Sequence, residues 1–299
     1  MSGKIESLSW EAYQATPGIS NSMLKWMHPP YTPAHFRARY ITGEITDEDT
    51  EAKRFGRLVH RLILEPDTMN GAFYVTPKTL DINVERLKKL KSAKVVSQTS
   101  DKATIEWNGT LSEADQWMRE HSDRPVLSAS DAQLAMRMRD AVWAHRGARA
   151  LLTGARTETC VFATDEDGTQ RKARVDVIPK SGNAIVDVKT VEQIDNESVE
   201  RAIWSYHWFR QGAYYLDLLK MAGIQRQVFA FIFVEKNPPY LVTIRPLSVD
   251  AETLGRMLYR RDLALYRHCL AENHWPGDPF DGQDVSIPSW QMRKFEEVI

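Results

Sequence analysis

Asp176, Asp187 and Lys189 are the residues whose types and spacing most clearly predict chemistry. They lie in two segments rich in Val and Ile, and residues 180–183 between these segments have the composition of a tight hairpin turn. With Ser181-Gly182 as a two-residue loop, Asp176 faces Asp187. Directly opposed side chains have Cβ atoms ~5 Å apart, so two carboxylates there need a positive partner. A divalent cation is the natural candidate.

Lys189 shares a face with Asp187, because residues two apart on a strand point the same way. A site with only a few protein oxygen ligands suits Mg²⁺, with Mn²⁺ as a substitute. These ions complete their coordination shells with water and phosphate oxygens. We expect an activated water to attack phosphorus. Lys189 would either orient that water and help to remove its proton or counter the charge of the transition state. The spacing alone fits equally well an ordinary hairpin with a surface ion pair.

This arrangement resembles the PD-(D/E)xK nuclease superfamily, although Val175 stands where the motif has proline and the second acid is Asp187 rather than glutamate, both of which are common variants. Gln211 and Tyr215, four residues apart on a helix expected over 198–222, resemble the Gln-xxx-Tyr motif that follows the active hairpin in RecB-type nucleases. The resemblance implies that both residues belong to the catalytic site.

Gly56 and His60 resemble the Gly-xxx-His element of the same nucleases, in which the histidine is an additional metal ligand. By that resemblance His60 joins Asp176 and Asp187 as a ligand, with the Val188 carbonyl as a fourth. The alternative is a partly exposed helical histidine, because isolated histidines seldom bind metal.

Further segments resemble one branch of this group, the RecE or exodeoxyribonuclease VIII type of phages and prophages. The resemblance covers most of the chain except about residues 75–125. The matching segments are Ile19-Ser20-Asn21-Ser22, Pro33-Ala34-His35-Phe36, Thr157-Glu158, Arg171-Lys172-Ala173-Arg174-Val175-Asp176 and Trp275-Pro276-Gly277.

The resemblance to RecE-type enzymes implies a Mg²⁺-dependent deoxyribonuclease that acts as a processive 5′-to-3′ exonuclease on double-stranded DNA ends and leaves single strands for recombination by annealing. It also implies a single-strand annealing partner, a homo-oligomer that forms a ring in some of these enzymes, and the cytoplasm of a bacterial or phage-infected cell. Glu158 would act close to the metal, although an exposed strand glutamate would have the same sequence pattern.

Two clusters of basic residues flank the predicted site. A net charge of −1 argues against a protein that coats nucleic acid with its whole surface, so local clusters matter more. Both clusters could hold DNA phosphates, and the alternative is a solvated charged face. The first contains Arg54, Arg57 and Arg61, and the second Arg171, Lys172 and Arg174.

The 299 residues, of which 42% are hydrophobic, can bury a substantial core as one large domain or two small ones. The resemblance implies a single nuclease domain over residues 1–299. No apolar run approaches membrane-spanning length, and residues 1–25 lack the apolar centre of a signal peptide, so we expect a cytoplasmic protein without membrane contact. Two cysteines, Cys160 and Cys269, are too few for a disulfide framework or a four-cysteine cluster.

The order of elements predicts an α/β fold with a restriction-endonuclease-like αβββαβ core, a mixed central sheet flanked by helices, and an N-terminal helical extension. Residues 1–75 would be the helical part that carries His60, 76–125 an irregular insertion, and 126–299 the core. The core elements are expected as a helix from Ser128 or Ser130 to Leu152, strands at 157–164, 170–179 and 184–190, the helix at 198–222, strands at 228–234 and 241–247, and a helix from 250 to 274.

Two other functions remain open at this stage. An endonuclease would use the same core and would cut closed circular DNA. A catalytically dead DNA-binding protein would keep the fold, but it would have little need for Lys189 beside two intact acids.

Overall fold

The computed structural model describes residues 3–46, 50–66, 73–83, 88, 94–100, 102–107, 112–121, 124, 126–278 and 282–296. The chain divides into two compact units. The first consists of Met1–Asn21 with Asp47–Tyr259, and the second of Ser22–Thr46 with Arg260–Ile299. Every residue predicted to act in catalysis, metal binding or DNA binding belongs to the first unit.

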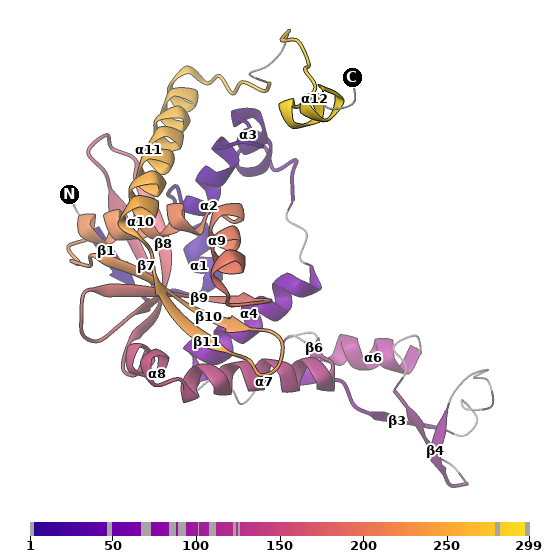
Figure 1. The fold of residues 1–299 in the computed structure, drawn as a ribbon. Helices are drawn as coiled ribbons and strands as arrows, with labels where there is room; N and C mark the ends of the chain where they lie inside the picture. The colour runs from indigo at the N-terminus through magenta and orange to yellow at the C-terminus, as the bar shows by residue number, and fades with distance from the viewer. Residues whose placement is uncertain are drawn as a thin grey trace. The chain divides into compact units, whose positions relative to one another are not determined.

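A six-stranded mixed sheet forms the centre of the first unit (Figure 1). Its strands are β1 (Gly3–Glu6), β7 (Arg156–Thr164), β8 (Gln170–Ile178), β9 (Ala184–Val191), β10 (Val228–Glu235) and β11 (Val242–Pro246). The strands are adjacent in that order. β9 and β10 run parallel, and the other neighbouring pairs are antiparallel. The parallel pair requires a long crossover, which is helical here.

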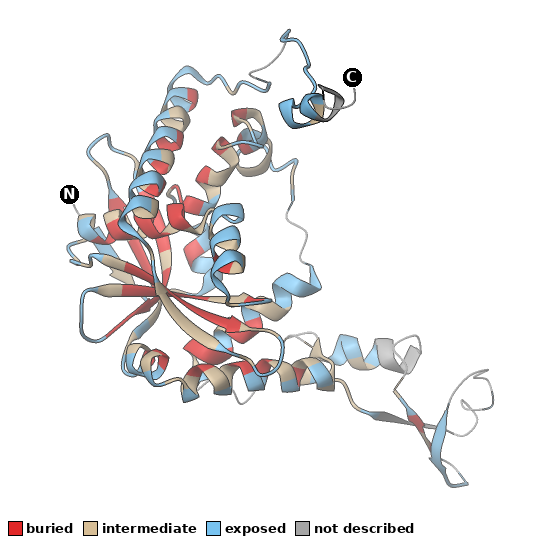
Figure 2. Cartoon of the chain, in the orientation of Figure 1, coloured by how far each residue is buried: buried red, intermediate tan, exposed pale blue. Residues whose placement is uncertain are grey.

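Helices cover both faces of this sheet (Figure 1). α4 (Glu51–Leu64), α7 (Ala129–Ala144) and α8 (Arg146–Leu152) lie on one face, and α10 (Trp208–Met221) lies on the other against β7, β8 and β10. Figure 2 shows the buried residues concentrated where these helices meet the strands. A mixed sheet between helical layers confirms the expected fold.

The strand β10 shows why its sequence is apolar at every position. Phe229, Phe231 and Phe233 follow one another along one face with ring centroids 5.0–5.1 Å apart. Ala230 and Ile232 face the hydrophobic core on the other side. A strand covered on both faces has no solvent side, so hydrophobic residues do not alternate with polar ones.

Two helices that the sequence predicts to be continuous are each broken. The segment expected at 198–222 forms α9 (Asn196–Ser205) and α10, with His207 between them in the left-handed region at φ 55°. The segment from Ser128 to Leu152 forms α7 and α8, because His145 leaves the helix and its Nδ1 accepts a hydrogen bond from the Ala148 N–H at 3.1 Å. That side-chain cap replaces a bond that a continuous helix would make. The last long helix, α11 (Val249–Glu272), matches its expected range within two residues.

The stretch 76–125, expected to be irregular, has regular elements in its described residues. Ala103 and Ile105 are buried in the strand Lys102–Glu106, whereas residues 95–98 are exposed throughout. Residues 84–87 and 89–93 of this stretch lie outside the described residues. The elements are a three-stranded antiparallel sheet of β3 (Thr79–Asn83), β5 (Lys102–Glu106) and β4 (Val95–Gln98), and the helix α6 (Ser112–Glu120). The parallel pair of β2 (Tyr74–Val75) and β6 (Val126–Leu127) flanks the stretch.

The second unit is helical in its described residues and has an aromatic centre. Phe36 stacks on Trp275 with centroids 5.5 Å apart, and it also contacts Tyr266 at 5.3 Å. Its helices are η1 (Lys25–Met27), α3 (Pro33–Tyr40), α12 (Ser289–Glu296), most of α2 (Asn21–Leu24) and the C-terminal part of α11. In the whole described part of the chain, no helix is both long enough and apolar enough to cross a membrane.

Candidate active site

The β8–β9 hairpin brings the two predicted acids together. Val177 pairs with Val186, so the same register places Asp176 opposite Asp187. Both acids are buried, with exposed fractions of 8% and 1%. Asp176 reaches across to β9, where its Oδ2 accepts a hydrogen bond from the Val188 N–H at 3.0 Å. The hairpin therefore holds two opposed carboxylates away from bulk water.

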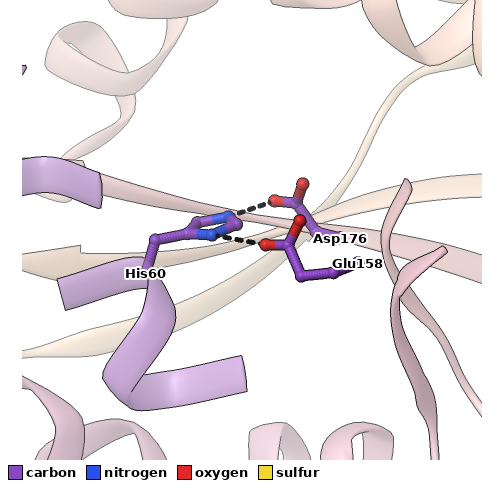
Figure 3. A group of neighbouring side chains, drawn as sticks. All are labelled: His60, Glu158 and Asp176. Atoms are coloured by element: carbon purple, nitrogen blue, oxygen red, sulfur yellow. Dashed lines mark hydrogen bonds and ion pairs between the residues drawn. The ribbon is translucent and has the colours of Figure 1, made fainter. Parts of the chain in front are cut away.

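His60 connects Asp176 with Glu158 (Figure 3). Its Nε2 lies 2.6 Å from Asp176 Oδ2, and its Nδ1 lies 3.0 Å from Glu158 Oε1. Because each ring nitrogen faces a carboxylate oxygen, the arrangement favours the doubly protonated, cationic imidazole. One donor atom from each of the three residues lies within 4.8 Å of the others. That spacing suits ligands of a single metal ion.

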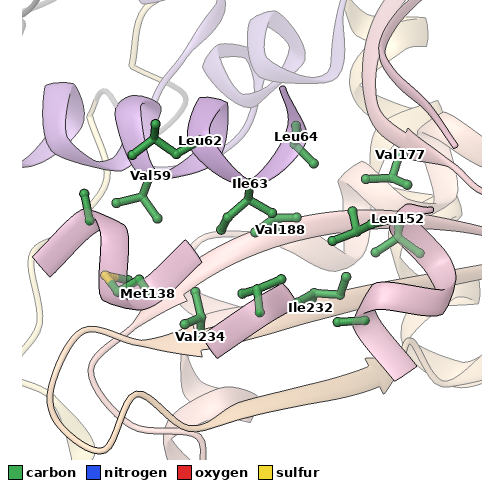
Figure 4. Close-up of a cluster of buried hydrophobic side chains, with 14 of the residues drawn as sticks. Val59, Leu62, Ile63, Leu64, Met138, Leu152, Val177, Val188, Ile232 and Val234 are labelled. Atoms are coloured by element: carbon green, nitrogen blue, oxygen red, sulfur yellow. The ribbon is translucent and has the colours of Figure 1, made fainter. Parts of the chain in front are cut away.

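The helix α4 presents His60 to this cluster because its neighbouring residues are anchored in the core (Figure 4). Val59, Leu62 and Ile63 are buried against β9, β10 and α7. The Ile63 carbonyl also accepts a hydrogen bond from the Trp143 indole N–H at 3.2 Å. The apolar side of α4 thus fixes the position of the imidazole at its edge.

Glu158 is held in a strained backbone conformation. The pairs Thr157–Val177 and Thr159–Val175 place it across from Asp176, yet its φ is 50°, in the left-handed region. A non-glycine residue there costs on the order of 1–3 kcal/mol, and such strain gathers at functional sites. Glu158 Oε2 forms an ion pair with Arg174 Nε at 2.6 Å, while Oε1 faces the imidazole.

Asp187 has a different set of partners, which come from β9 and α10. Lys189 Nζ forms an ion pair with Asp187 Oδ2 at 2.6 Å, and Gln211 Nε2 donates to Asp187 Oδ1 at 2.6 Å. The Lys189 ammonium also lies 5.4 Å from the centre of the Trp208 ring. The amide and the ammonium therefore fix both oxygens of this carboxylate.

Burial and charge separate the pKa values of the two acids. Burial alone would raise the pKa of Asp176, but the charge and hydrogen bond of His60 outweigh it and lower that pKa to about 2. Burial and the negative charge of Asp176 raise the pKa of Asp187 to about 7, against the opposing effect of Lys189. The two acids in turn favour the charged forms of His60 and Lys189. Burial disfavours both charged forms, but Asp176 and Glu158 raise the pKa of His60 to about 10, and Asp187 and Asp176 raise the pKa of Lys189.

Tyr215, the second residue of the predicted Gln-xxx-Tyr motif, lies close enough to Asp176 and Asp187 for their charges to raise its pKa. Burial raises its pKa well above the usual value, and the charges of Tyr13, Asp176 and Asp187 add to that effect. A hydrogen bond with Gln211 acts in the opposite direction. Tyr215 is therefore a neutral phenol that supports Gln211.

The predicted basic residues separate into exposed and buried groups. Arg54, Arg57 and Arg61 lie exposed on α4, and Arg61 pairs with Glu65 at 3.4 Å. Arg174 is half-buried and pairs with Glu158. The three arginines of α4 thus lie on the exposed surface of the helix that carries His60.

The structure corrects the prediction that Arg171 and Lys172 hold phosphates, because both are buried. The Arg171 guanidinium lies over the rings of Tyr214 and Tyr259, 4.4 and 5.1 Å from their centres. The Lys172 ammonium donates to the backbone carbonyls of residues 13, 14 and 16 at 2.6–3.1 Å. These charges therefore hold the fold together rather than face a ligand.

The predicted metal ligands lie in two neighbouring groups of contacts. His60 contacts Asp176 and Glu158, whereas Asp187 lies with Lys189 and Gln211. The observed contact of Val188 is made by its N–H, so its carbonyl ligand role stays a prediction. Arg174 faces Cys160 in the strand register, so its ion pair with Glu158 is diagonal, and the sequence had no signal for it beyond the adjacency of the two strands.

The chain is similar to known proteins in sequence and in fold. The sequence model of the family described as "PDDEXK-like domain of unknown function (DUF3799)" matches residues 20–279. None of the curated proteins matches the chain. The crystal structure of a protein from Eubacterium rectale described as a "Putative exonuclease" is similar over 95% of this chain and 96% of its own, with a TM-score of 0.55 and 12% identity. At that identity the likeness shows the fold alone.

A second solved structure, that of SSO0001, covers 62% of this chain and 80% of its own at 14% identity, and its TM-score of 0.27 carries no argument. The family match spans the hairpin, His60, Glu158 and the α10 residues together. The chain therefore belongs to the PDDEXK-like domain family.

Proposed function

We propose that the protein is a metal-dependent deoxyribonuclease that hydrolyses phosphodiester bonds. The observation that carries this proposal is the convergence of Asp176, Asp187, Lys189 and His60 at one end of the β8–β9 hairpin. Two opposed buried acids raise each other's energy unless a cation joins them. His60 and Lys189 supply positive charge beside these acids.

The residues at this centre fit a divalent cation. Histidine nitrogen and carboxylate oxygens converge from His60, Asp176 and Glu158, and Asp187 lies opposite Asp176. We propose that His60, Asp176 and Asp187 hold Mg²⁺, with Mn²⁺ as a substitute and Glu158 beside it. When bound, such an ion supplies Lewis acidity toward phosphate oxygens and lowers the pKa of water.

Lys189 acts in this proposal as a fixed positive charge. Its raised pKa keeps the ammonium protonated near neutral pH, so it cannot readily accept a proton from water. It can donate hydrogen bonds to phosphate oxygens whose negative charge grows in the transition state. Gln211 keeps Asp187 in place beside it, through the 2.6 Å hydrogen bond.

The finer proposal is a processive 5′-to-3′ exonuclease that acts on double-stranded DNA ends, works with a single-strand annealing protein and forms a homo-oligomer. Support comes from the RecE-type sequence motifs and from the exonuclease description of the similar crystal structure. The exposed arginines of α4 would contact the DNA phosphates.

Cleavage of end-labelled DNA tests this proposal. The protein is incubated with Mg²⁺ or Mn²⁺, linear duplexes labelled at either the 5′ or the 3′ ends, and closed circular plasmid. We expect early release of the 5′ label and an intact circle. A nicked or linearised circle would show an endonuclease. Cleavage that persists unchanged in Asp187→Asn, purified in parallel, would assign the activity to a contaminant, and no cleavage with either metal would refute the proposal.

A further inference from the structure

Large aromatic side chains are exposed where α9 joins α10. Trp204 and Tyr206 have exposed fractions of 61% and 58%, while Trp208 is half-buried. Aromatic side chains bury roughly 150–250 Å² each when they are covered. Burial of apolar surface stabilises a fold by ~25 cal/mol per Å². Two aromatic side chains that stay in water therefore contribute little of this stabilisation to the fold. Such a surface beside a candidate active site indicates a binding role.

The rings of Tyr206 and Trp208 form a stack that leads to the acids. Their centroids are 5.1 Å apart, and the ring planes differ by 22°. Trp208 also contacts Phe231 and Phe233 of β10, each at 6.0 Å. The Lys189 ammonium lies 5.4 Å from the Trp208 ring centre and is ion-paired with Asp187. The inner end of the stack is therefore fixed at the candidate catalytic lysine.

The break between the helices is what creates this stack. On a continuous helix, residues two apart point about 200° away from each other and cannot touch. The left-handed conformation of His207, at φ 55°, interrupts the helix between Tyr206 and Trp208 and lets their rings meet. This conformation costs roughly 1–2 kcal/mol for an L residue. The fold accepts strain at the point where it positions the stack.

We propose that the Tyr206–Trp208 stack is a platform for an unpaired DNA base, which adds to the stack on the outer side of Tyr206. This inference rests on the proposed nuclease function. Trp208 covers one side of the Tyr206 ring, and more than half of the Tyr206 residue is exposed. Bases stack on aromatic side chains with ~1–3 kcal/mol each and little dependence on sequence.

A nucleobase fits this surface better than an apolar protein segment does. The stack runs from Tyr206 through Trp208 to an ammonium and a pair of acids, so a chain that carries both flat rings and charged groups suits this surface. A DNA strand has both parts. Bases inside a duplex have no free face, so the platform would take a base from a single-stranded overhang or a frayed end.

Fluorescence of 2-aminopurine in the overhang of a duplex measures this binding directly. The full-length protein is titrated in EDTA, which stops metal-dependent cleavage. We expect the wild type and Tyr206→Phe to quench the fluorescence. Tyr206→Ala should abolish quenching and raise the Kd by ~5- to ~150-fold, the equivalent of one stacked base. Trp204→Ala is the matched control, because Trp204 is equally exposed but stacks on Phe209.

An abasic overhang completes a double comparison. It should weaken binding of the wild type as much as Tyr206→Ala does, and it should not weaken the variant further. The inference is overturned if the wild type does not quench, if Tyr206→Ala binds as the wild type does, or if Trp204→Ala has the same effect. Because binding is measured without cleavage, a protein that cuts DNA but does not need Tyr206 refutes the platform alone. A protein that needs Tyr206 for binding but never cuts DNA refutes the nuclease proposal alone.

Discussion

Asp176 and Asp187 face each other across one hairpin, yet their surroundings give them opposite properties. Asp176 accepts hydrogen bonds from His60 and from the Val188 N–H, and its pKa falls to about 2. Asp187 is more deeply buried and faces the charge of Asp176, so its pKa rises to about 7 even with Lys189 beside it. Identical residues in facing positions are thus differentiated by the helices that contact them.

This difference has a definite sign for stability. The pKa of Asp176 is lower in the folded state, so its contribution is present above its ordinary pKa and is lost as the pH falls toward 2. The pKa of Asp187 is higher in the folded state, so its ionisation lowers stability as the pH rises from about 4 to 7. His60 stabilises the fold fully below its ordinary pKa, and this contribution is lost as the pH rises toward 10.

Replacing each acid separately should break this comparison most clearly. Both Asp176→Asn and Asp187→Asn should lower DNA cleavage by at least ~10³-fold, because each removes charge from the proposed metal site. Their stabilities should change in opposite directions. At pH 8 in EDTA, Asp176→Asn should lose about 3 kcal/mol of unfolding free energy, because it breaks a buried ion pair. Asp187→Asn should gain on the order of 1 kcal/mol, because it removes a carboxylate whose ionisation is disfavoured.

Chemical denaturation with parallel cleavage assays measures both effects. A loss of stability in Asp187→Asn as large as that in Asp176→Asn would show that the two acids have equivalent environments. Retained cleavage in either variant would remove that acid from the site.

Lys189→Ala should separate catalysis from metal binding. Loss of the ammonium should slow cleavage by ~10²-fold or more, the range for lost transition-state electrostatics. Metal affinity should change less, since the lysine is a partner of Asp187 and not a ligand. Single-turnover cleavage at saturating Mn²⁺ measures the first effect, and calorimetric titration with Mn²⁺ measures the second. Equal losses in both would assign Lys189 to metal-site assembly.

His60→Gln tests the surroundings of Asp176, as Lys189→Ala tests those of Asp187. We expect a ~10- to ~100-fold loss of metal affinity, seen as a higher Mn²⁺ requirement for cleavage. In the wild type, a metal must displace the proton held by the imidazole, so affinity should rise by up to ~10-fold per pH unit above pH 7. Between pH 7.0 and 8.5 the variant should lose this slope. An unchanged metal requirement and an unchanged slope would make His60 a structural partner of Asp176 only.

The sequence predicted the elements whose patterns are local. The turn between β8 and β9 determines which residues face each other, so it was sufficient to place Asp176 opposite Asp187. The apolar run of β10 predicted a strand covered on both faces. The four residues of β1 were not predicted, because their strand character depends on pairing with β7, a partner more than 150 residues away.

The details that the sequence did not reveal arise from tertiary contacts. The sequence around Arg171 and Lys172 is typical of a phosphate-binding patch. In the structure, however, tyrosine rings cover Arg171 and backbone carbonyls bind Lys172. Glu158 and His207 both have a positive φ. Neither position could be predicted from the sequence, because neither residue is a glycine. Glu158 has partners on other elements, His60 and Arg174, which a single sequence does not show.

Gly56→Ala should have the smallest effect of these substitutions. It changes α4, the helix that carries the His60 partner of Asp176. A Cβ at Gly56 would meet no heavy atom within 4 Å, so the described fold does not require glycine there. Alanine should raise the free energy of unfolding by ~1 kcal/mol, since glycine is unfavourable inside a helix. Gly56 lies one turn before His60 on the same side of α4, where DNA would approach the backbone closely. We therefore expect a more stable protein with weaker DNA binding, measured by denaturation and by fluorescence anisotropy, and unchanged DNA affinity would show that the substrate passes elsewhere.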